Sequence, residues 1–570
     1  MRKNHQLFDK KSLVVSLISL IFTFLVFGLR PYLTSHCEFC KHITAGYYFE
    51  QLFIILPVLP ISFFIYSFLP TRRIFDYKKF ISFFSTRLYI GIITIFYFIV
   101  TNIISFFFYN HIPQGDAVVA YIQAKIFANG HLWVTPPRYP EFFLNSMVIH
   151  NGKYFSMVQH GHSLLLAGFT ALHIPYLLSP ILGTATIIIF FFLLRNCFDE
   201  DTAKTGILFL VLSPTFLFIS SSYLNQNSSI FFIMLSLLFL SLTLKHNKNL
   251  YSFLSGVFLG LAFFSRTTMI AFLPGFAFVF FLTGSKKKNV LAFFIMGFVP
   301  AFAIQFIDNF IYTGNVFRFG YSLHPDSNLH SIGFGLGKGE PTFGINGHTP
   351  LKALINFFYD VFAFSLHLYG WPLFSLSFIP VAFVKWKKNI WDIFSIAVII
   401  SAVIFFSFYW FHGVSPMGPK YYFEIIPLLV VLTIRGLKKF NARSLVTILF
   451  IFDILIYIPS GLKIFRGAWG TNNHCYNEAK KQELHNAIVF IHDLKGTNEY
   501  ERTINRHNYL SVAFRNAPFI KRGDIIYAKD LEKKNFLLIN QFRERKVFIF
   551  KYLNGGKEWS LTPYKYDGST

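Results

Sequence analysis

RLYIGIITIFYFIVTNIISFFFY, residues 87–109, is an apolar run whose only charged residue is Arg87 at its start. A helix of about 20 apolar residues crosses the ~30 Å hydrocarbon core of a bilayer. Similar runs recur along the 570 residues, separated by short segments that contain Lys and Arg. This repetition predicts an all-α, polytopic membrane protein.

The composition supports the same class. Hydrophobic residues make up 54% of the chain, aromatic residues 20% and charged residues only 14%, whereas an average soluble chain has about 25% charged residues. These values exclude a soluble globular protein, a disordered chain and a coiled coil. The net charge of +25 would indicate a polyanion partner in a soluble chain. In a membrane protein its meaning depends on which loops contain the charged residues.

Hydrophobic runs and their interruptions predict about thirteen transmembrane helices. They are 12–29, 50–69, 87–109, 177–195, 205–223, 229–244, 250–265, 268–283, 289–311, 361–384, 392–411, 421–435 and 444–460.

The Lys and Arg residues predict the orientation of these spans. If the N-terminus is cytoplasmic, the short segments on its side hold 23 of the 52 Lys and Arg residues, and the loops on the opposite side hold 10. The remaining 19 follow residue 460, in a long translocated tail that counts little toward topology. We therefore expect a multi-pass protein of the inner (plasma) membrane with a cytoplasmic N-terminus and an extracytoplasmic C-terminal domain. The charge then reflects topology, and no nucleic-acid partner is expected.

The N-terminal region contains one ambiguous motif. The first span follows a basic start but lacks a small-residue cleavage site, so it is interpreted as an anchor and not as a signal peptide. Cys37 and Cys40 then lie outside, where a local disulfide, two unpaired thiols and a zinc site with the neighbouring histidines all remain open. Cys197 and Cys475 are not expected to be catalytic.

The largest polar interruption before the tail is the predicted outer loop 110–176. Ala117 to Asn129 has the pattern of a helix that ends at Gly130, with Asp116 at its N-cap position. Asp116 could be a purely structural cap, or a carboxylate that acts on a substrate at the outer surface.

Several blocks in this loop and beyond it resemble GT-C glycosyltransferases of family 39, the relatives of protein O-mannosyltransferases and lipid A aminoarabinose transferases. The blocks are 115–121 (GDAVVAY), 129–131 (NGH), 151–156 (NGKYFS), 160–166 (HGHSLLL), 259–262 (LGLA), 265–268 (SRTT), 309–315 (NFIYTGN) and 418–424 (GPKYYFE). The resemblance extends over roughly residues 87–440. It rests on the order of the blocks and on their predicted location on the same, outer side of the membrane. Two blocks depart from the family pattern: Ala117 follows Asp116 where the family has Glu, and His160-Gly161-His162 replaces a Pro-Pro or Pro-Gly element.

The resemblance implies a domain organisation. Residues 1–86 would be two extra N-terminal transmembrane helices, and residues 87–460 a GT-C-like core with the outer catalytic loop 110–176 and a second outer loop, 313–350. Residues 461–570 would form a small α/β extracytoplasmic domain. In that domain 486–491, 524–527 and 547–552 have the pattern of strands and 478–485 that of a helix.

The resemblance also implies an enzyme that transfers a monosaccharide from a polyprenyl-phosphate donor to a lipid, glycan or protein acceptor. Asp116 is the candidate base for the acceptor hydroxyl, Asp308 is the second candidate, and Tyr121 is a candidate substrate contact. The apolar spans would hold the isoprenoid. No cofactor is implied; a metal is not expected, and a divalent cation remains an alternative. The rival interpretation is a transporter or flippase of lipid-linked sugars.

Two cations are candidate ligands of the donor phosphate. Arg266 lies between two short apolar segments, so it marks a site unless it snorkels to the interface or pairs with Asp308. Lys420 is either a phosphate contact or an interfacial anchor. Glu424, four residues further on, is expected on the same helix face, where it would position Lys420.

The remaining candidates are aromatic residues and histidines. Tyr421 and Tyr422 are candidate substrate contacts beside Lys420. His160 is a candidate phosphate ligand and His162 a candidate sugar contact, with metal binding and plain interface polarity as alternatives. The glycine alternation at 333–339 follows no strand and opens no helix, so it predicts an outer loop over the acceptor and not a P-loop.

Overall fold

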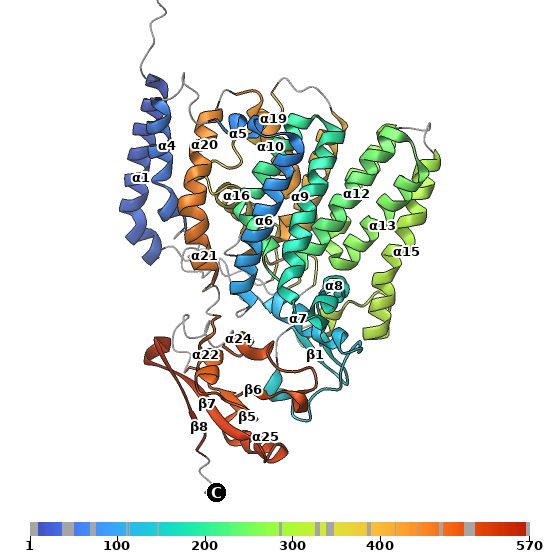
Figure 1. Cartoon of the computed structure of the whole chain (residues 1–570), viewed down its shortest axis with the longest axis vertical. Helices are drawn as coiled ribbons and strands as arrows, with labels where there is room; N and C mark the ends of the chain where they lie inside the picture. The colour runs from blue at the N-terminus through green and yellow to red at the C-terminus, as the bar shows by residue number, and fades with distance from the viewer. Residues whose placement is uncertain are drawn as a thin grey trace, which may run out of the picture.

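The computed structural model describes residues 9–36, 51–68, 76–109, 112, 115–144, 147–283, 288–324, 331–337, 347–384, 389–415, 418–440, 442–466, 471–494 and 508–565. A helical part and a small sheet-containing domain are stacked along the long axis of the molecule (Figure 1). Cys37 and Cys40 lie outside the described residues.

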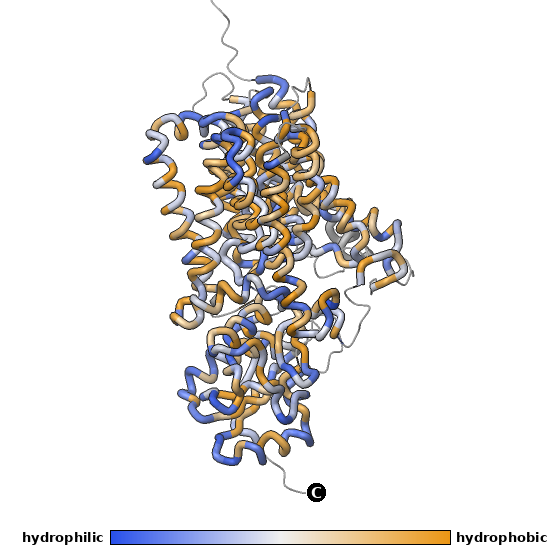
Figure 2. Tube along the Cα trace, turned by 90° about the vertical axis from the view of Figure 1, so that its right-hand side faces the viewer, coloured by the Kyte–Doolittle hydropathy of each residue, from blue (hydrophilic) through white to orange (hydrophobic). Residues whose placement is uncertain are grey.

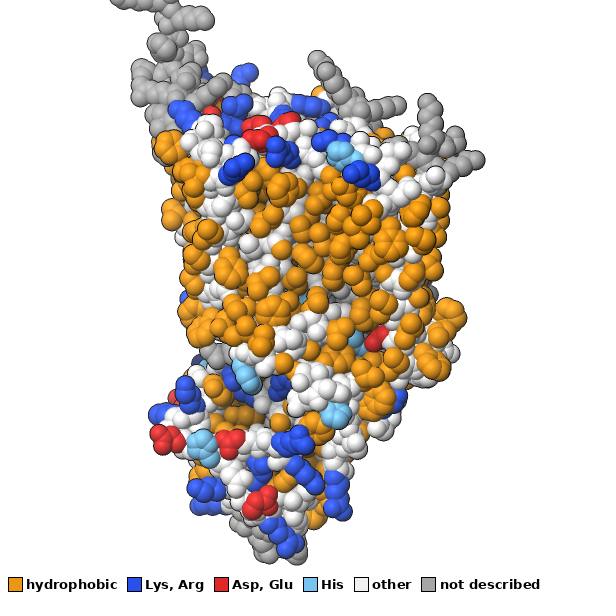
Figure 3. All heavy atoms as spheres, turned by 45° about the vertical axis from the view of Figure 1, so that its right-hand side comes forward, with side chains coloured by type: hydrophobic (Ala, Val, Ile, Leu, Met, Phe, Trp, Pro, Cys, Tyr) orange, Lys and Arg blue, Asp and Glu red, His pale blue; other side chains and the backbone are white. Residues whose placement is uncertain are grey.

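The surface of the helical part is arranged as a membrane protein requires. On the face that Figure 3 shows, apolar side chains form a broad band, and charged side chains gather beyond the band at both ends. The hydropathy along the chain shows the same division, with apolar helices and a more polar lower domain (Figure 2). This distribution matches a bundle that is solvated by lipid at its middle and by water at its ends.

Seven segments among the described residues are helical, long and apolar enough to cross a membrane. They belong to α1 (Lys10–His36), α6 (Thr86–Tyr109), α9 (Leu178–Cys197), α12 (Gln226–His246), α15 (Lys288–Thr313), α18 (Ile390–Ser407) and the run α20 (Arg443–Phe452), η7 (Asp453–Tyr457) and α21 (Ile458–Arg466). The bent pair α10 (Glu200–Val211) and α11 (Pro214–Ser220), with 68° between the helices, would make an eighth. The multi-pass helical class is confirmed, whereas the number thirteen is not.

Several predicted spans correspond to shorter or broken helices. The apolar stretches Gln51–Ser67, Asn249–Ser265 and Thr267–Thr283 are shorter than the seven; they contain α4 (Val58–Ser67), α13 (Asn249–Ser265), η3 (Thr267–Phe272) and α14 (Leu273–Thr283). The continuous span predicted at 361–384 is wrong, because α16 (Pro350–His367) ends before α17 (Phe378–Val381) begins. Gly370 has φ +64° there, and Pro372 follows it; a left-handed residue and a proline both end helices.

Small residues allow α13 and α15 to pack closely. A Cβ atom on Gly256 would lie 2.1 Å from the Phe294 carbonyl oxygen, and one on Gly297 would lie 2.1 Å from that of Phe253. Gly256 and Gly260 form the GxxxG spacing that brings membrane helices together. This contact fixes the end of α13, where Arg266 follows.

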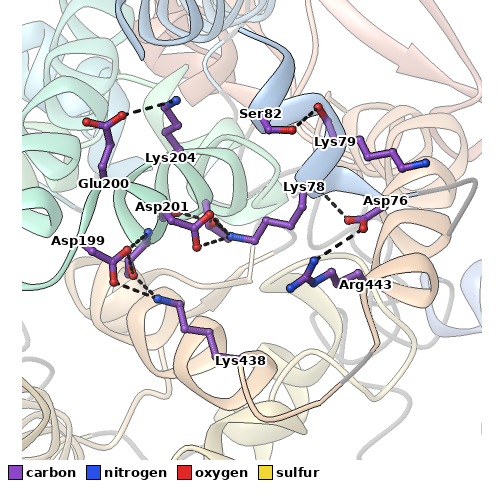
Figure 4. A network of polar contacts seen from close by, with 12 residues as sticks. Asp76, Lys78, Lys79, Ser82, Asp199, Glu200, Asp201, Lys204, Lys438 and Arg443 are labelled. Atoms are coloured by element: carbon purple, nitrogen blue, oxygen red, sulfur yellow. Dashed lines mark hydrogen bonds and ion pairs between the residues drawn. The ribbon is translucent and has the colours of Figure 1, made fainter. Parts of the chain in front are cut away.

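One end of the helical part has a network of charged residues on, or directly next to, α5 (Tyr77–Phe83), α10, α19 (Ile426–Leu437) and α20 (Figure 4). Lys78 lies 2.6 Å from Asp201 and Lys438 lies 3.2 Å from Asp199. These residues come from segments that the charge pattern assigned to one side of the membrane.

The predicted outer loop 110–176 lies at the opposite end, beside the sheet-containing domain (Figure 1). It contains α7 (Gly115–Ala128), η1 (Pro140–Phe143), β1 (Val148–His150), β2 (Tyr154–Ser156) and α8 (His160–Ala171). Strands β1 and β2 pair antiparallel. Gly130, after α7, has φ +78°, as expected for the residue that ends a helix.

The C-terminal part is a small α/β domain, as predicted. Its sheet has the order β6-β5-β7-β8, with β5 parallel to β6 and to β7, and β8 antiparallel to β7. The elements are α22 (His474–Lys481), β5 (Ala487–Ile491), α24 (Leu510–Ala513), β6 (Ile525–Lys529), α25 (Asn535–Gln541), β7 (Lys546–Leu553) and β8 (Glu558–Pro563). The three predicted strands correspond to β5, β6 and β7, and β8 was not predicted.

The predicted outer loop and the C-terminal domain are packed together. Phe142 and Phe143 of η1 are buried in the hydrophobic core that β5, β6 and β7 form. The Lys125 ammonium group of α7 donates a hydrogen bond of 2.8 Å to the Phe514 carbonyl and another to that of Asn516. The domain is therefore anchored directly to the helix that begins beside Asp116.

Candidate active site

Asp116 forms an ion pair with Lys420 at the end of the helical part that is next to the C-terminal domain. The Lys420 Nζ atom donates a hydrogen bond of 2.6 Å to Asp116 Oδ2. The helix α7 begins at Gly115, so Asp116 lies in its first turn and not at the predicted N-cap. The Asp116 side chain keeps 30% of its surface exposed, so a ligand can reach it.

Arg266 and Glu424 form a second ion pair, which is buried. Arg266 Nη1 donates to both Glu424 oxygens, at 2.9 and 2.7 Å, and Ser229 Oγ also donates to Glu424. The side chains are only 6% and 2% exposed. The suggested pairing of Arg266 with Asp308 is therefore wrong. Glu424 was expected to position Lys420, but it pairs with Arg266.

Tyr421 connects the two ion pairs. The Arg266 guanidinium carbon lies 5.7 Å from the centre of the Tyr421 ring, and Lys420 Nζ lies 5.8 Å from the same centre. A Cβ atom on Gly413 would lie 2.2 Å from this ring, and Gly413 has φ +67°, so only glycine fits beside it. Two cations, two carboxylates and one aromatic face thus form a continuous site.

Two further tyrosines, Tyr321 and Tyr409, lie near Asp116. They were not predicted from the sequence as site residues. Burial, with the charge of Asp116 nearby, raises the pKa of Tyr409 to about 12, and the same two causes raise the pKa of Tyr321. Tyr321 lies in η5 (Gly320–Leu323), within the predicted outer loop 313–350. Both tyrosines keep their protons at neutral pH, so they can donate hydrogen bonds. A polar aromatic residue at the outer end of a span was the only available signal for Tyr409.

His160 and Asp308 form a third pair on the adjacent side of the site. His160 Nδ1 lies 2.9 Å from Asp308 Oδ1, and His160 Nε2 lies 3.0 Å from the Ser156 carbonyl oxygen. Because both partners are acceptors, the arrangement is fully satisfied when the ring carries two protons. The Tyr312 ring lies 4.2 Å from the imidazole, centre to centre.

This third pair lines a pocket between α8, α15 and η5, with an empty volume of about 270 Å³. Gln159 and Tyr321 also line it, and the Gln159 side chain donates to Thr267, the residue after Arg266, at 3.2 Å. The pocket with His160 and Asp308 therefore adjoins the site of Arg266 and Tyr421.

The remaining predicted residues lie apart from these pairs. The Tyr121 ring packs against Tyr223 and Phe514, at 5.4 and 6.2 Å between centres. His162 is fully buried, and burial lowers its pKa to about 4, so it is neutral at pH 7 and supplies no positive charge for a phosphate. The Tyr422 ring packs on Phe406, at 4.8 Å between centres. In the described part of the chain no three His, Cys, Asp or Glu side chains are grouped to hold a metal ion.

Residues 160–307 match the family of dolichyl-phosphate-mannose-protein mannosyltransferases. This match confirms the GT-C resemblance. The matched segment contains His160, His162 and Arg266, whereas Asp116, Asp308 and Lys420 lie outside it. No curated protein matches the chain.

Three solved structures are similar to the chain at low sequence identity. Apo ArnT from Cupriavidus metallidurans has 11% identity and a TM-score of 0.47, over 82% of this chain and 92% of that one. The same protein bound to undecaprenyl phosphate has 14% identity and a TM-score of 0.41, over 63% of this chain and 60% of that one. The apo Archaeoglobus fulgidus oligosaccharyltransferase has 12% identity and a TM-score of 0.41, over 80% of this chain and 69% of that one.

Proposed function

We propose that this protein transfers a monosaccharide from a polyprenyl-phosphate donor to a lipid, glycan or protein acceptor on the outer face of the membrane. The observation that carries the proposal is the joining of Asp116–Lys420 and Arg266–Glu424 through Tyr421. The site includes Asp116 of α7, and α7 lies at the end of the helical part that is next to the C-terminal domain (Figure 1). A phosphate on a membrane-embedded carrier and an acceptor in water would meet at that level.

The cations have free capacity for a phosphate. In the described part of the chain only Nη1 of the Arg266 guanidinium group donates hydrogen bonds, which leaves Nε and Nη2 for ligand oxygens. The Lys420 ammonium group has three protons, and the bond to Asp116 uses one. Charge-assisted donors of this kind stabilise the negative charge that develops on a leaving phosphate.

The reaction follows from these positions. An oxygen of the acceptor hydroxyl attacks the anomeric carbon of the sugar, while the bond from that carbon to the phosphate oxygen breaks. The hydroxyl proton passes to Asp116, and the bonding electrons leave with the polyprenyl phosphate, whose charge Lys420 and Arg266 stabilise. Lys420 also holds the Asp116 carboxylate in place, and His160 with Asp308 would contact the sugar or the acceptor from the adjoining pocket.

The proposal includes an orientation of the chain. The segments with most Lys and Arg lie at the end of the helical part that contains Lys78 and Lys438, so this end would face the cytoplasm. Reporter fusions after residues 130 and 470 should then both report an external location. A cytoplasmic signal from either fusion would contradict the outer location of the site.

A transfer assay tests the function itself. Purified protein in proteoliposomes receives labelled polyprenyl-phosphate sugars together with cell-envelope acceptors, and mass spectrometry compares envelope glycans from cells with and without the protein. We expect labelled acceptor and free polyprenyl phosphate as products. Movement of intact lipid-linked sugar between leaflets, with no cleavage of the sugar–phosphate bond, would instead support the flippase alternative.

A further inference from the structure

A second polar pocket lies between α16 and α18, at the end of α18 that is near the candidate active site. Four residues of α16 line it with helical spacing: Ala353, Asn356, Phe357 and Asp360, which share one face of a helix. Its empty volume, which includes space open to the solvent, is about 260 Å³. Tyr421 separates it from Lys420, because Phe406, which also lines the pocket, stacks on the Tyr421 ring at 5.4 Å.

Asp360 is the unusual residue of this pocket. It is only 6% exposed, and among the described residues it forms no ion pair and no hydrogen bond, with Oδ1 buried and unbonded. An unpaired carboxylate at such a depth costs several kcal/mol, and acids in membrane domains normally face a partner or a ligand. A positively charged ligand would offset this cost.

Aromatic rings form the other walls of the pocket. Phe406, Phe411, Tyr422 and Phe357 all line it, together with the imidazole of His412. Aromatic faces attract organic cations, and rings around a carboxylate are the usual recognition element for ammonium groups. Asn356 and His412 add polar groups to the lining.

We propose that the pocket of Asp360 binds an organic ammonium group, supplied by an amine-bearing lipid head group or by a soluble amine. The proposal is independent of sugar transfer, because neither Asp116 nor Arg266 lines this pocket. Lipid is within reach, since Leu354 and Phe358 of the same helix are 51% and 61% exposed, as expected for lipid-facing side chains of a membrane helix.

The test measures ligand-induced stabilisation of the full-length protein. Thermal unfolding is followed in detergent with increasing ethanolamine, and in nanodiscs of phosphatidylglycerol with or without phosphatidylethanolamine. Potassium chloride and glycerol serve as probes without an ammonium group. We expect stabilisation by ethanolamine or by phosphatidylethanolamine and by neither control, and the arm that responds identifies the source of the amine.

Variants assign the response to the pocket. Asp360→Asn should weaken the apparent affinity for the amine at least tenfold, and Phe411→Leu, which keeps the carboxylate, should weaken it several-fold. Asp453→Asn is the matched control. Within the described part of the chain, Asp453 is also a buried acid with both oxygens unbonded, but it does not line the pocket, so the response should remain.

Three results would overturn the proposal: no stabilisation of the wild type by either amine, equal stabilisation by glycerol, or a full response in Asp360→Asn. If Asp360→Asn does not fold, the wild-type response and Phe411→Leu decide, and an unchanged affinity in Phe411→Leu then counts against the pocket.

Discussion

The two ends of the helical part use charged residues in opposite ways. At the end with α5 and α10, Lys438 and Asp199 form an ion pair with side chains 43% and 54% exposed. At the end with α7, Arg266 and Glu424 are 6% and 2% exposed, and one Arg266 nitrogen donates to both Glu424 oxygens. Exposed pairs contribute little to stability, whereas a buried charge must be paired or bind a ligand. The proposed function uses this difference: the exposed charges at one end would set the topology, and the buried charges at the other end would bind a ligand.

The largest expected effect is on turnover. Asp116→Asn keeps the shape of the side chain and removes its basicity, so sugar transfer should fall by about 10²–10⁴ while the protein still inserts and binds the donor. Transfer is measured in membranes with matched protein levels. Asp199→Asn, at the opposite end, is the control and should leave transfer unchanged. Near-normal transfer by Asp116→Asn would exclude Asp116 as the base and make Asp308 the next candidate.

The second prediction compares the stability of the two ends. Arg266→Met leaves the buried Glu424 carboxylate without a positively charged partner, so the free energy of unfolding should fall by about 3–5 kcal/mol. Lys438→Met should lower it by no more than about 1 kcal/mol. Denaturant unfolding in detergent measures both values. The double variant Arg266→Met with Glu424→Met should recover stability, and equal losses in the two single variants would remove the distinction between the ends.

Part of this arrangement was predictable from sequence and part was not. The strands β5, β6 and β7 and the grouping of the outer blocks followed from local apolar runs and from charge. The pairing of Asp116 with Lys420 joins residues 304 positions apart and depends on how the helices pack. Glu424 was expected on the face of Lys420, but residues Lys420–Ile425 form a 3-10 helix. In a helix with about three residues per turn, residues four positions apart point in different directions. Glu424 therefore points away from Lys420 and contacts Arg266.

The third prediction concerns the donor phosphate. Lys420→Gln should weaken binding of polyprenyl phosphate by about 1.5–3 kcal/mol, the value of a lost charged hydrogen bond. The fold should be retained, because the Asp116 left behind is partly exposed. Binding is measured by titration of the lipid phosphate into nanodiscs, with Lys438→Gln as the matched control. Equal affinity in Lys420→Gln and the wild type would make Lys420 an interfacial anchor only.

The smallest effect is a pH dependence at the contact between α7 and the C-terminal domain. Burial lowers the pKa of Lys125 from 10.5 to about 7, so between these values the unfolded chain holds a proton that the folded protein has lost. The free energy of unfolding should therefore rise with pH in this window, by at most about 1.4 kcal/mol per pH unit. Lys125→Met should lack this contribution. Hydrogen exchange of the segment 510–516 at pH 7 and pH 9 measures it, and identical pH dependence in both proteins would contradict it.

The central claim is that a lipid phosphate binds at the end of the helical part that contains Arg266 and Lys420. Photo-crosslinking tests this claim most directly. A polyprenyl phosphate with a photoreactive group on the isoprene unit next to the phosphate is added to the protein in nanodiscs, and mass spectrometry maps the modified residues. The account predicts crosslinks at residues 265–268 or 420–425, which an excess of unmodified polyprenyl phosphate abolishes. Crosslinks concentrated around Lys78, Lys438 and Arg443 would contradict it.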